Sequence, residues 1–548
     1  MDNIYLPSRA ASSSNLNISE NPPLGLDFGT TNSVLAHFTD EIHRKGAFAY
    51  SFPLLDGSHI YPSILYYDET SDTTFTGLAA KVRAITNPEG IITSIKREIS
   101  KEFIKLANKK LYPVDIASRI IAGLFREIKS TELNLCPSVV TMTVPYYFKQ
   151  AQNILLQDAA ERACEEVFGC KFSIKLIPEP VAAAIDYIYS EHSEKNLTQT
   201  ILIYDIGGGT CDVTIVKYLL SGSSLEFEVL GIDGDGQLGG DDIDQLFLEY
   251  ICNENDIDID TLQSDHKYTK SLAILKDAIR GLKENLSIQQ EGNLIIPSLF
   301  VNDSYINIDI VVSRREFTNL LSSTTIKGRN ETVFDIINAA LNRLKTKTRN
   351  ITVDALLPIG GTSCMPAIQQ LVQQKFPNSR HIFLPDKGNQ VSVARGAAIV
   401  SALKDSRALF PLGKSIRNIS IIMRVPHTLS VAMYDGSLVK LIEANSPAPS
   451  RSMKTFYATR LDSTGRYIEL PSINLYQGEG NSIKSEHVQL VGKIDLSSYH
   501  LHAHGRKLSD IPFQITFSAD ATSLTANIVV SGVNADKTDL IINKKIQL

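Results

Sequence analysis

The order of apolar and polar positions predicts two similar β-hairpins. In residues 24–35, and again in residues 200–217, an apolar run leads into glycines and an alternating run leads out. Such a pattern is typical of two antiparallel strands joined by a tight turn. Three residues of the first stretch correspond to three of the second, namely Asp27, Gly29 and Thr30 to Asp205, Gly207 and Thr210. Because the copies lie about 178 residues apart, we expect a duplicated lobe.

The turn of the second hairpin contains three consecutive glycines, Gly207, Gly208 and Gly209, with Asp205 and Asp212 on either side. Glycine loses much backbone entropy on folding, so this turn must need a backbone without Cβ atoms. Successive bare N–H groups form a concavity that binds anions such as phosphate. The two aspartates would then hold a hydrated cation that bridges the phosphates. The alternative is an ordinary glycine-rich turn with no ligand.

Longer periodicities predict helices and strands around the two hairpins. We expect helices in residues 114–127, 152–168 and 391–404, and a strand in residues 139–144 that ends at Pro145. Predicted strands and predicted helices thus both occur between and after the two hairpins.

Two further positions follow predicted strands. Residues 355–362 form an apolar run that ends in glycines, and Thr362 is placed to cap a helix that runs to Phe376. Glu179 stands before Pro180, which suits the first turn of a helix. Its carboxylate is placed to point from a strand end into a cleft, although it could equally serve only the helix dipole.

The pattern of apolar and polar residues changes after residue 405. Short alternating runs and turn signals fill residues 425–548, which predicts an all-β module, a sandwich. We therefore divide the chain into a flexible leader (1–23), an α/β part (24–405), an interdomain linker with an apolar centre (406–424) and the β module (425–548).

Composition narrows the class of protein. The chain has 548 residues, of which 43% are hydrophobic and 21% charged, as in ordinary globular proteins. A net charge of −6 without a long basic run argues against a nucleic-acid partner, and no apolar run is long enough for a membrane helix. Six scattered cysteines without a C-x-x-C pair argue against a zinc site and disulfides, and favour a cytoplasmic location. We interpret Cys211, inside the glycine hairpin, as a small half-buried residue rather than a nucleophile, because no histidine stands near it in sequence.

Together the motifs resemble the heat-shock 70 (Hsp70) chaperone family, of the DnaK and HscA type, within the actin-like ATPase superfamily. The resemblance rests on five stretches in the family's order: residues 25–33, 176–184, 205–212, 238–244 and 359–362. Residues 425–429 and 476–479 resemble marks of that family's substrate-binding domain. The resemblance implies an α/β actin-like two-lobed ATPase domain followed by an all-β sandwich substrate-binding domain. The chain stops at Leu548, about where the family's helical lid would begin, so we expect no lid.

The resemblance also assigns roles. Lys96 matches the family's catalytic lysine, Thr31 would help orient the attacking water, and Pro145 matches a proline that switches between nucleotide states. Glu179 and Asp205 would act at the water and at Mg²⁺. The expected magnesium environment, mostly through water, is formed by Asp27, Asp205 and Asp212. The expected ATP-binding residues are Gly29, Thr30, Thr31, Asn32, Gly207, Gly208, Gly209, Thr210, Gly239, Gly240, Lys283, Ser287, Gly360 and Gly361.

Several positions depart from the family's pattern. Asn153 replaces an arginine that supports signalling between the domains, Cys364 replaces one that packs on adenine, and Arg280 replaces a glutamate of the nucleoside pocket. An apparent insertion in residues 460–471 lies within the expected peptide-binding module. Adenine affinity and interdomain coupling are the properties that these departures affect.

Three functions are compatible with the sequence. The first is an ATP-dependent chaperone that binds unfolded or specific client polypeptides with a J-domain co-chaperone. An HscA-like form of it would serve an iron–sulfur scaffold protein. The second is a catalytically weak Hsp70-like co-chaperone or scaffold, which Arg280 and Cys364 favour. The third is a small-molecule kinase of the actin-like superfamily, which would leave the β module unexplained.

Overall fold

A computed structural model gives the fold of the protein. The residues that it describes are 4–5, 22–38, 49–106, 109–132, 135–146, 148, 150–171, 174–190, 196–222, 224–383, 388–404, 418–425, 428–433, 435–444, 446–448, 450–457, 460–461, 466–469, 472–478, 480–485, 488–495, 501–519, 523–531, 533–534 and 536–547. The chain forms two compact units. The first comprises Met1–Tyr146, Ile154–Phe227 and Ile232–Ser420, and the second comprises Tyr147–Asn153, Glu228–Gly231 and Ile421–Leu548.

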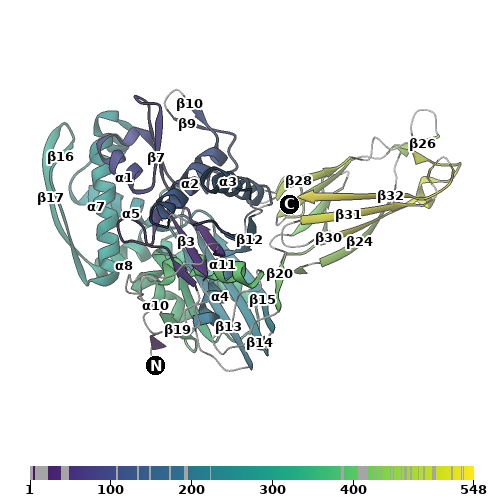
Figure 1. Cartoon of the computed structure of the whole chain (residues 1–548). Helices are drawn as coiled ribbons and strands as arrows, with labels where there is room; N and C mark the ends of the chain where they lie inside the picture. Colours follow the sequence, from purple (N-terminus) through teal and green to yellow (C-terminus); the bar gives the residue numbers. More distant parts are fainter. Residues whose placement is uncertain are drawn as a thin grey trace. The chain divides into compact units, whose positions relative to one another are not determined.

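Two mixed sheets organise the first unit (Figure 1). One has the order β12-β11-β2-β3-β4, with β5 also paired to β3, and the other contains β1-β19-β18-β13-β14-β15. The strands of the first sheet are β2 (Leu24–Phe28), β3 (Asn32–Phe38), β4 (Ala49–Ser51), β5 (Tyr61–Pro62), β11 (Val140–Val144) and β12 (Lys175–Pro178). Those of the second are β1 (Ile4–Tyr5), β13 (Asn196–Ile206), β14 (Cys211–Ser221), β15 (Ser224–Asp235), β18 (Ala355–Ile359) and β19 (Arg380–Phe383).

The two sheets repeat one arrangement of strands. Strands β2 and β3 form an antiparallel hairpin, with β11 parallel to β2 and β12 parallel to β11. In the same way β13 and β14 form an antiparallel hairpin, with β18 parallel to β13 and β19 parallel to β18. Both predicted hairpins are therefore confirmed, and the repeat is the duplicated lobe expected of an actin-like ATPase fold.

Helices and small sheets complete the first unit. The helices are α1 (Gly77–Thr86), α2 (Pro113–Thr131), α3 (Gln150–Phe168), α4 (Glu179–Ser190), α5 (Gly240–Glu254), α6 (Ile259–Ser264), α7 (Thr269–Ile288), α8 (Arg314–Ser323), α9 (Val333–Lys347), α10 (Pro366–Lys375) and α11 (Gly388–Lys404). The smaller strands are β6 (Leu65–Asp68), β7 (Thr73–Thr76), β8 (Ile91–Ile92), β9 (Ile104–Leu106), β10 (Lys109–Leu111), β16 (Glu291–Val301) and β17 (Ser304–Ser313). Hairpin β16–β17 packs beside α7, as Figure 1 shows.

Helix α11 covers the first sheet because its small residues allow close approach. A Cβ atom on Gly25 of β2 would lie 2.2 Å from the carbonyl oxygen of Ala394, so only glycine fits there. The Ser401 hydroxyl donates a hydrogen bond to the carbonyl oxygen of Leu24 (2.6 Å) and lies 2.7 Å from the hydroxyl of Thr141. Helix α11 is thus fixed to a central strand of the first sheet.

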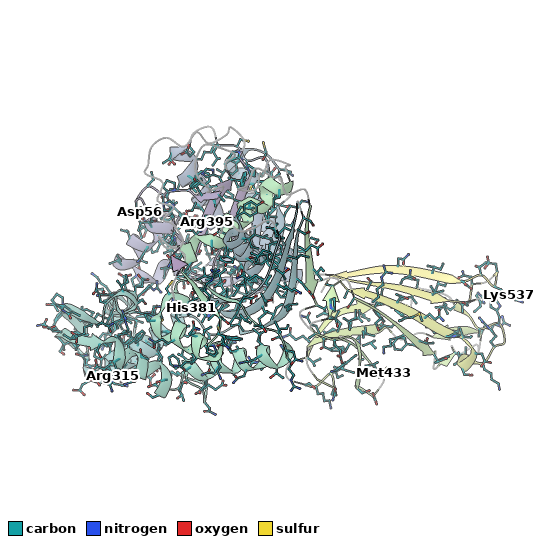
Figure 2. The ribbon with its side chains drawn as sticks, turned by 90° about the horizontal axis from the view of Figure 1, so that it is seen from below. Asp56, Arg315, His381, Arg395, Met433 and Lys537 are labelled. Atoms are coloured by element: carbon teal, nitrogen blue, oxygen red, sulfur yellow. The ribbon has the colours of Figure 1, made fainter. Side chains whose placement is uncertain are left out.

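The second unit is a β-sandwich. Its two four-stranded sheets have the orders β22-β21-β27-β28 and β24-β30-β31-β32. Side chains project to both sides of these strands (Figure 2), and the inward ones form one core that includes Val431, Leu475, Phe517 and Ile528. The strands are β20 (Asn418–Arg424), β21 (Leu429–Ala432), β22 (Leu438–Ile442), β23 (Pro447–Ala448), β24 (Ser450–Tyr457), β25 (Arg460–Leu461), β26 (Tyr467–Glu469), β27 (Ile473–Gly478), β28 (Val488–Ile494), β29 (Leu501–His502), β30 (Pro512–Ala519), β31 (Ser523–Val530) and β32 (Leu540–Gln547).

One predicted helix start is wrong. Thr362 does not cap the helix after β18 but begins a short 3₁₀ turn (Thr362–Cys364), and α10 starts at Pro366 with Met365 as its N-cap. Proline suits the first helical position because its missing N–H would be unbonded there anyway. The Thr362 hydroxyl instead donates to the carbonyl oxygen of Gly207 at 2.9 Å.

Some predicted segments lie largely outside the described residues. These are the leader except for residues 4–5 and 22–23, residues 406–417 of the linker, and residues 462–465 and 470–471 of the apparent insertion. The end of the linker region forms β20, in which Met423 pairs with Ala448 of β23. Among the described helices, none is both long and apolar enough to span a membrane.

Candidate active site

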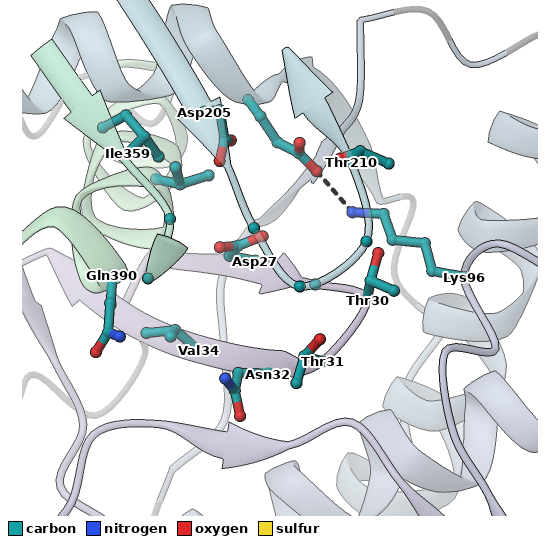
Figure 3. A pocket seen from close by; sticks show the side chains of 18 of the residues that line it. Asp27, Thr30, Thr31, Asn32, Val34, Lys96, Asp205, Thr210, Ile359 and Gln390 are labelled. Atoms are coloured by element: carbon teal, nitrogen blue, oxygen red, sulfur yellow. Dashed lines mark hydrogen bonds and ion pairs between the residues drawn. The ribbon is translucent and has the colours of Figure 1, made fainter. Parts of the chain in front are cut away.

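A pocket in the first unit lies where the ends of both hairpins meet (Figure 3). It encloses roughly 720 Å³ of space outside protein atoms, open solvent at its mouth included. The predicted residues that line it are Asp27, Gly29, Thr30, Thr31, Asn32, Lys96, Pro145, Glu179, Asp205, Gly207, Gly208, Gly209, Thr210, Gly360 and Gly361. The fold therefore brings together the glycine turns of both hairpins, Lys96 and the predicted carboxylates Asp27, Glu179 and Asp205.

Lys96 and Glu179 form a buried ion pair in this pocket. The Lys96 Nζ atom donates to Glu179 Oε1 at 2.6 Å, and the two side chains are only 4% and 11% exposed. Lys96 lies in a turn after β8 that is anchored by the buried side chains of Ile95 and Ile99. Glu179 is the first residue of α4, directly after β12. Because both chain segments are fixed by packing, the ammonium group is held at one place in the pocket.

Three further carboxylates are buried around this ion pair. Burial, followed by repulsion from Glu179, raises the pKa of Asp27 to about 7, although Lys96 and a hydrogen bond from Thr143 act in the other direction. Burial and the neighbouring carboxylates hold the pKa of Asp205 and of Asp212 well above its usual range. Such a concentration of buried negative charge favours a cation or protons at the site.

The residues present fit a hydrated magnesium ion. Among the described residues no three acidic, histidine or cysteine side chains are arranged to ligate an ion together directly. Asp27 and Asp205 nevertheless face one shared pocket and interact electrostatically. Mg²⁺ commonly keeps several of its waters in proteins and is held by one or two carboxylates plus substrate phosphates. These carboxylates are thus suited to bind the ion through its water shell.

The glycine turns interlock. A Cβ atom on Gly208 would lie 1.8 Å from Thr31 Oγ1, and one on Gly239 would lie 2.4 Å from the backbone of Gly208. By contrast, a Cβ atom on Gly207 would meet no other atom within 4 Å, so this glycine faces open space. The glycines thus serve two purposes, because they allow three turns to pack together and leave room beside the exposed backbone.

The hydroxyl of Thr31 has no partner within the described structure. Its Oγ1 atom is buried and makes no hydrogen bond there, and Thr31 lines the pocket. A buried hydroxyl without a partner costs about 1–3 kcal/mol. A phosphate oxygen or a water molecule in the pocket would satisfy this group.

Sequence reasoning missed a third wall of the pocket. Helix α11 contributes Asn389, Gln390 and Val393, and the carbonyl oxygen of Asn389 accepts a hydrogen bond from the Gly360 N–H at 3.1 Å. Gly360 itself has a φ of +76°, a backbone conformation that favours glycine. Gln390 carries a buried Oε1 atom without a partner in the described structure. In the sequence, the only indication that Asn389 and Gln390 belong to a site was their position at the start of a helix.

Five predicted residues are not among those that line the pocket: Asp212, Gly239, Gly240, Lys283 and Ser287. Asp212 pairs with Asp205 across the hairpin. The N–H of Gly240 donates to the Gly207 carbonyl oxygen at 2.9 Å, so the start of α5 supports the glycine turn.

The departure at Arg280 builds an ion-pair network next to these supporting residues. Lys283 Nζ lies 2.7 Å from Asp244 Oδ1, and Arg280 Nε lies 3.2 Å from Asp244 Oδ2. Arg280 also reaches Asp241, at 3.6 Å. Lys283, which was expected to contact nucleoside, is therefore held by a carboxylate of α5.

The structure also places the other two residues that depart from the family pattern, Cys364 and Asn153. Cys364 lies in the 3₁₀ turn behind Gly360, and burial raises the pKa of its thiol to about 11. Asn153 is buried on α3, with an Oδ1 atom that has no partner in the described structure. All six cysteines are free, and Cys211 is fully buried, where the sequence predicted a half-buried small residue.

Comparison with known proteins agrees with this architecture. A family model described as "Hsp70 protein" matches residues 23–110 and 101–527. The chaperone protein DnaK of Ureaplasma parvum serovar 3 is 30% identical over 502 residues, which cover 90% of this chain and 74% of the relative. DnaK of Ureaplasma urealyticum serovar 10 matches to the same extent. The chain therefore belongs to the Hsp70 family of chaperones.

Proposed function

We propose that the protein hydrolyses ATP and uses this reaction to control the binding of client polypeptide in its β-sandwich unit. The observation that carries the proposal is the buried Lys96–Glu179 ion pair, set among carboxylates and glycine turns in one pocket. Hsp70 membership supports the choice of ATP over other phosphate ligands. The family match extends into the β-sandwich unit, which a small-molecule kinase would leave unexplained.

The side chains have distinct tasks in this proposal. Lys96, held by Glu179, stabilises negative charge on the transferring phosphoryl group. Thr31 offers its unpartnered hydroxyl to the phosphate or to the attacking water. Asp27 and Asp205 would hold a hydrated Mg²⁺, which would neutralise charge on the phosphates. Pro145, at the pocket wall after β11, is the proposed switch between nucleotide states.

The test is the substitution Lys96→Ala. Loss of a charge-stabilising group is expected to lower turnover by about 100-fold or more, while nucleotide binding stays measurable. Lys81→Ala is the matched control, because Lys81 forms a surface ion pair with Asp277 at 3.2 Å outside the pocket. Undiminished hydrolysis by the Lys96 variant would refute the assignment. Absence of hydrolysis in the wild-type protein would favour the scaffold alternative.

We further propose a J-domain co-chaperone and an iron–sulfur scaffold protein as partners. Residues 61–64, 93–97 and 239–244 resemble the corresponding stretches of the HscA branch, which serves iron–sulfur cluster assembly, and this resemblance supports the scaffold partner. ATP turnover should therefore rise when a J-domain protein and an iron–sulfur scaffold protein are added together. Stimulation by the J-domain protein and unfolded peptide alone would instead favour a general chaperone. The cytoplasmic location stays a prediction.

A further inference from the structure

Helices α4 and α11 both begin in the active-site pocket. Glu179 is the first residue of α4, and Asn389 and Gln390 lie in the first turn of α11. Helix α11 also covers β2, the strand that carries Asp27. The position of α4 along α11 therefore sets where the Glu179 carboxylate lies relative to the rest of the pocket.

The two helices touch through backbone rather than through interlocking side chains. A Cβ atom on Gly396 would lie only 1.8 Å from the carbonyl oxygen of Ala182. The neighbouring residues of α4, such as Ala183, are small and fully buried. Small apolar surfaces allow close approach, but they provide few features that define one position of a helix along its neighbour.

One polar contact, between Asp186 and Arg395, does define the position of α4 along α11. Asp186 lies seven residues, or two turns, after Glu179 and thus on the same face of α4. The Arg395 guanidinium of α11 reaches it with Nε at 3.1 Å from Oδ1 and Nη2 at 2.6 Å from Oδ2. The side chains are 9% exposed for Arg395 and 0% for Asp186. Arg395, labelled in Figure 2, is next to Gly396 and so lies at the close contact itself.

Stability alone is a poor explanation for this ion pair. Desolvation of two charges often costs as much as their attraction returns, and apolar residues can replace such pairs without loss. A planar guanidinium that meets a carboxylate at two points does, however, require a defined geometry. The pair is therefore suited to fix how the two helices are aligned.

We propose that Asp186 and Arg395 are positioning residues that fix α4 against α11 and thereby hold Glu179 at Lys96. They touch no reacting group, and they act on hydrolysis only through the Lys96–Glu179 pair. The predicted effect of this ion pair on turnover rests on the proposed function. Its predicted effect on the chemical reactivity of Lys96 does not require hydrolysis.

The experiment uses the full chain with two variants. Arg395→Lys keeps the charge but loses the planar fork, and the double variant Asp186→Leu with Arg395→Met replaces both charges by apolar groups. Two quantities are measured: kcat and KM for ATP, and the rate at which an amine-acylating reagent labels Lys96. Lys283 serves as the internal reference for labelling, because it is buried in its own ion pair with Asp244.

In the folded double variant we expect kcat to fall about 10-fold with KM little changed, because a displaced catalytic group slows chemistry more than binding. We also expect Lys96 labelling to rise several-fold relative to Lys283. Arg395→Lys should give the same changes at smaller size, and it decides the question if the double variant does not fold. As a control, Leu321→Ala removes a buried side chain of α8, so it should reduce stability without changing kcat or labelling.

Wild-type labelling of Lys96 and wild-type kcat in the folded variants would overturn the inference. If the wild-type protein does not hydrolyse ATP, the proposed function fails on its own. Labelling of Lys96 then still decides whether the ion pair positions Glu179.

Discussion

Substitution of Asp27 by Asn should stabilise the protein above pH 7 when nucleotide and metal are absent. Burial, together with the Glu179 charge, raises the pKa of Asp27 from 3.8 to about 7. Above that pH the carboxylate is ionised in surroundings that favour its neutral form. Asn removes the charge but keeps an oxygen that can accept the hydrogen bond from Thr143 Oγ1, now at 3.1 Å.

The sign and size of this effect on stability follow from the pKa of Asp27 in the unfolded chain and in the folded protein. Between about pH 4 and pH 7 the folded protein retains a proton on Asp27 that the unfolded chain has released, so stability decreases as the pH rises through this window. Each pKa unit corresponds to about 1.4 kcal/mol. The difference between 3.8 and about 7 therefore limits the destabilisation to about 4 kcal/mol, and most of it should be recovered in Asp27→Asn at pH 8.

Urea unfolding at pH 5 and pH 8, in buffer with a metal chelator, measures this effect. The wild-type protein should lose more stability than Asp27→Asn between the two pH values. Asp56→Asn is the matched control, because hydrogen bonds from Ser58 lower the pKa of exposed Asp56 and it titrates below this window. Equal pH dependence of the wild-type protein and Asp27→Asn would refute the reasoning.

Two further substitutions test the packing. Gly208→Ala places a methyl group 1.8 Å from Thr31 Oγ1 and must displace it, so nucleotide affinity by calorimetry should fall about 10-fold. Gly236→Ala, whose Cβ atom meets nothing within 4 Å, is the control, and equal affinities would contradict the interlocked turns. In the β-sandwich, Phe517→Ala should cost about 3–5 kcal/mol in denaturant unfolding, because this side chain is fully buried. Exposed Gln514→Ala on the same strand should cost little, and a similarly small loss for Phe517 would argue against the sandwich core.

Local sequence was enough to predict the hairpins but not the whole pocket. The turns at Gly29 and at Gly207 depend on neighbouring residues, so their pattern is visible in a few positions. The start of α10 was misplaced at Thr362, although Pro366 offered the better signal.

Contacts between segments far apart in the chain could not be predicted from local sequence. Gln390 belongs to the pocket only because α11 returns to the first sheet, and no motif marks it. Arg395 and Asp186 are separated by 209 positions, so nothing in the local sequence indicates that they pair. Lys283 matched a family position, but its ion pair with Asp244 appears only in three dimensions.

The hydrogen bonds from Ser401 to Leu24 and to Thr141 have a consequence for synthesis of the chain. Until α11 has left the ribosome, strands β2 and β11 lack the helix that covers them, although both were made hundreds of residues before. Contacts of such long sequence separation form slowly, because a large loop must close first. A nascent chain therefore carries these apolar strands without their covering helix until α11 (Gly388–Lys404) has been made, which is most of its own translation.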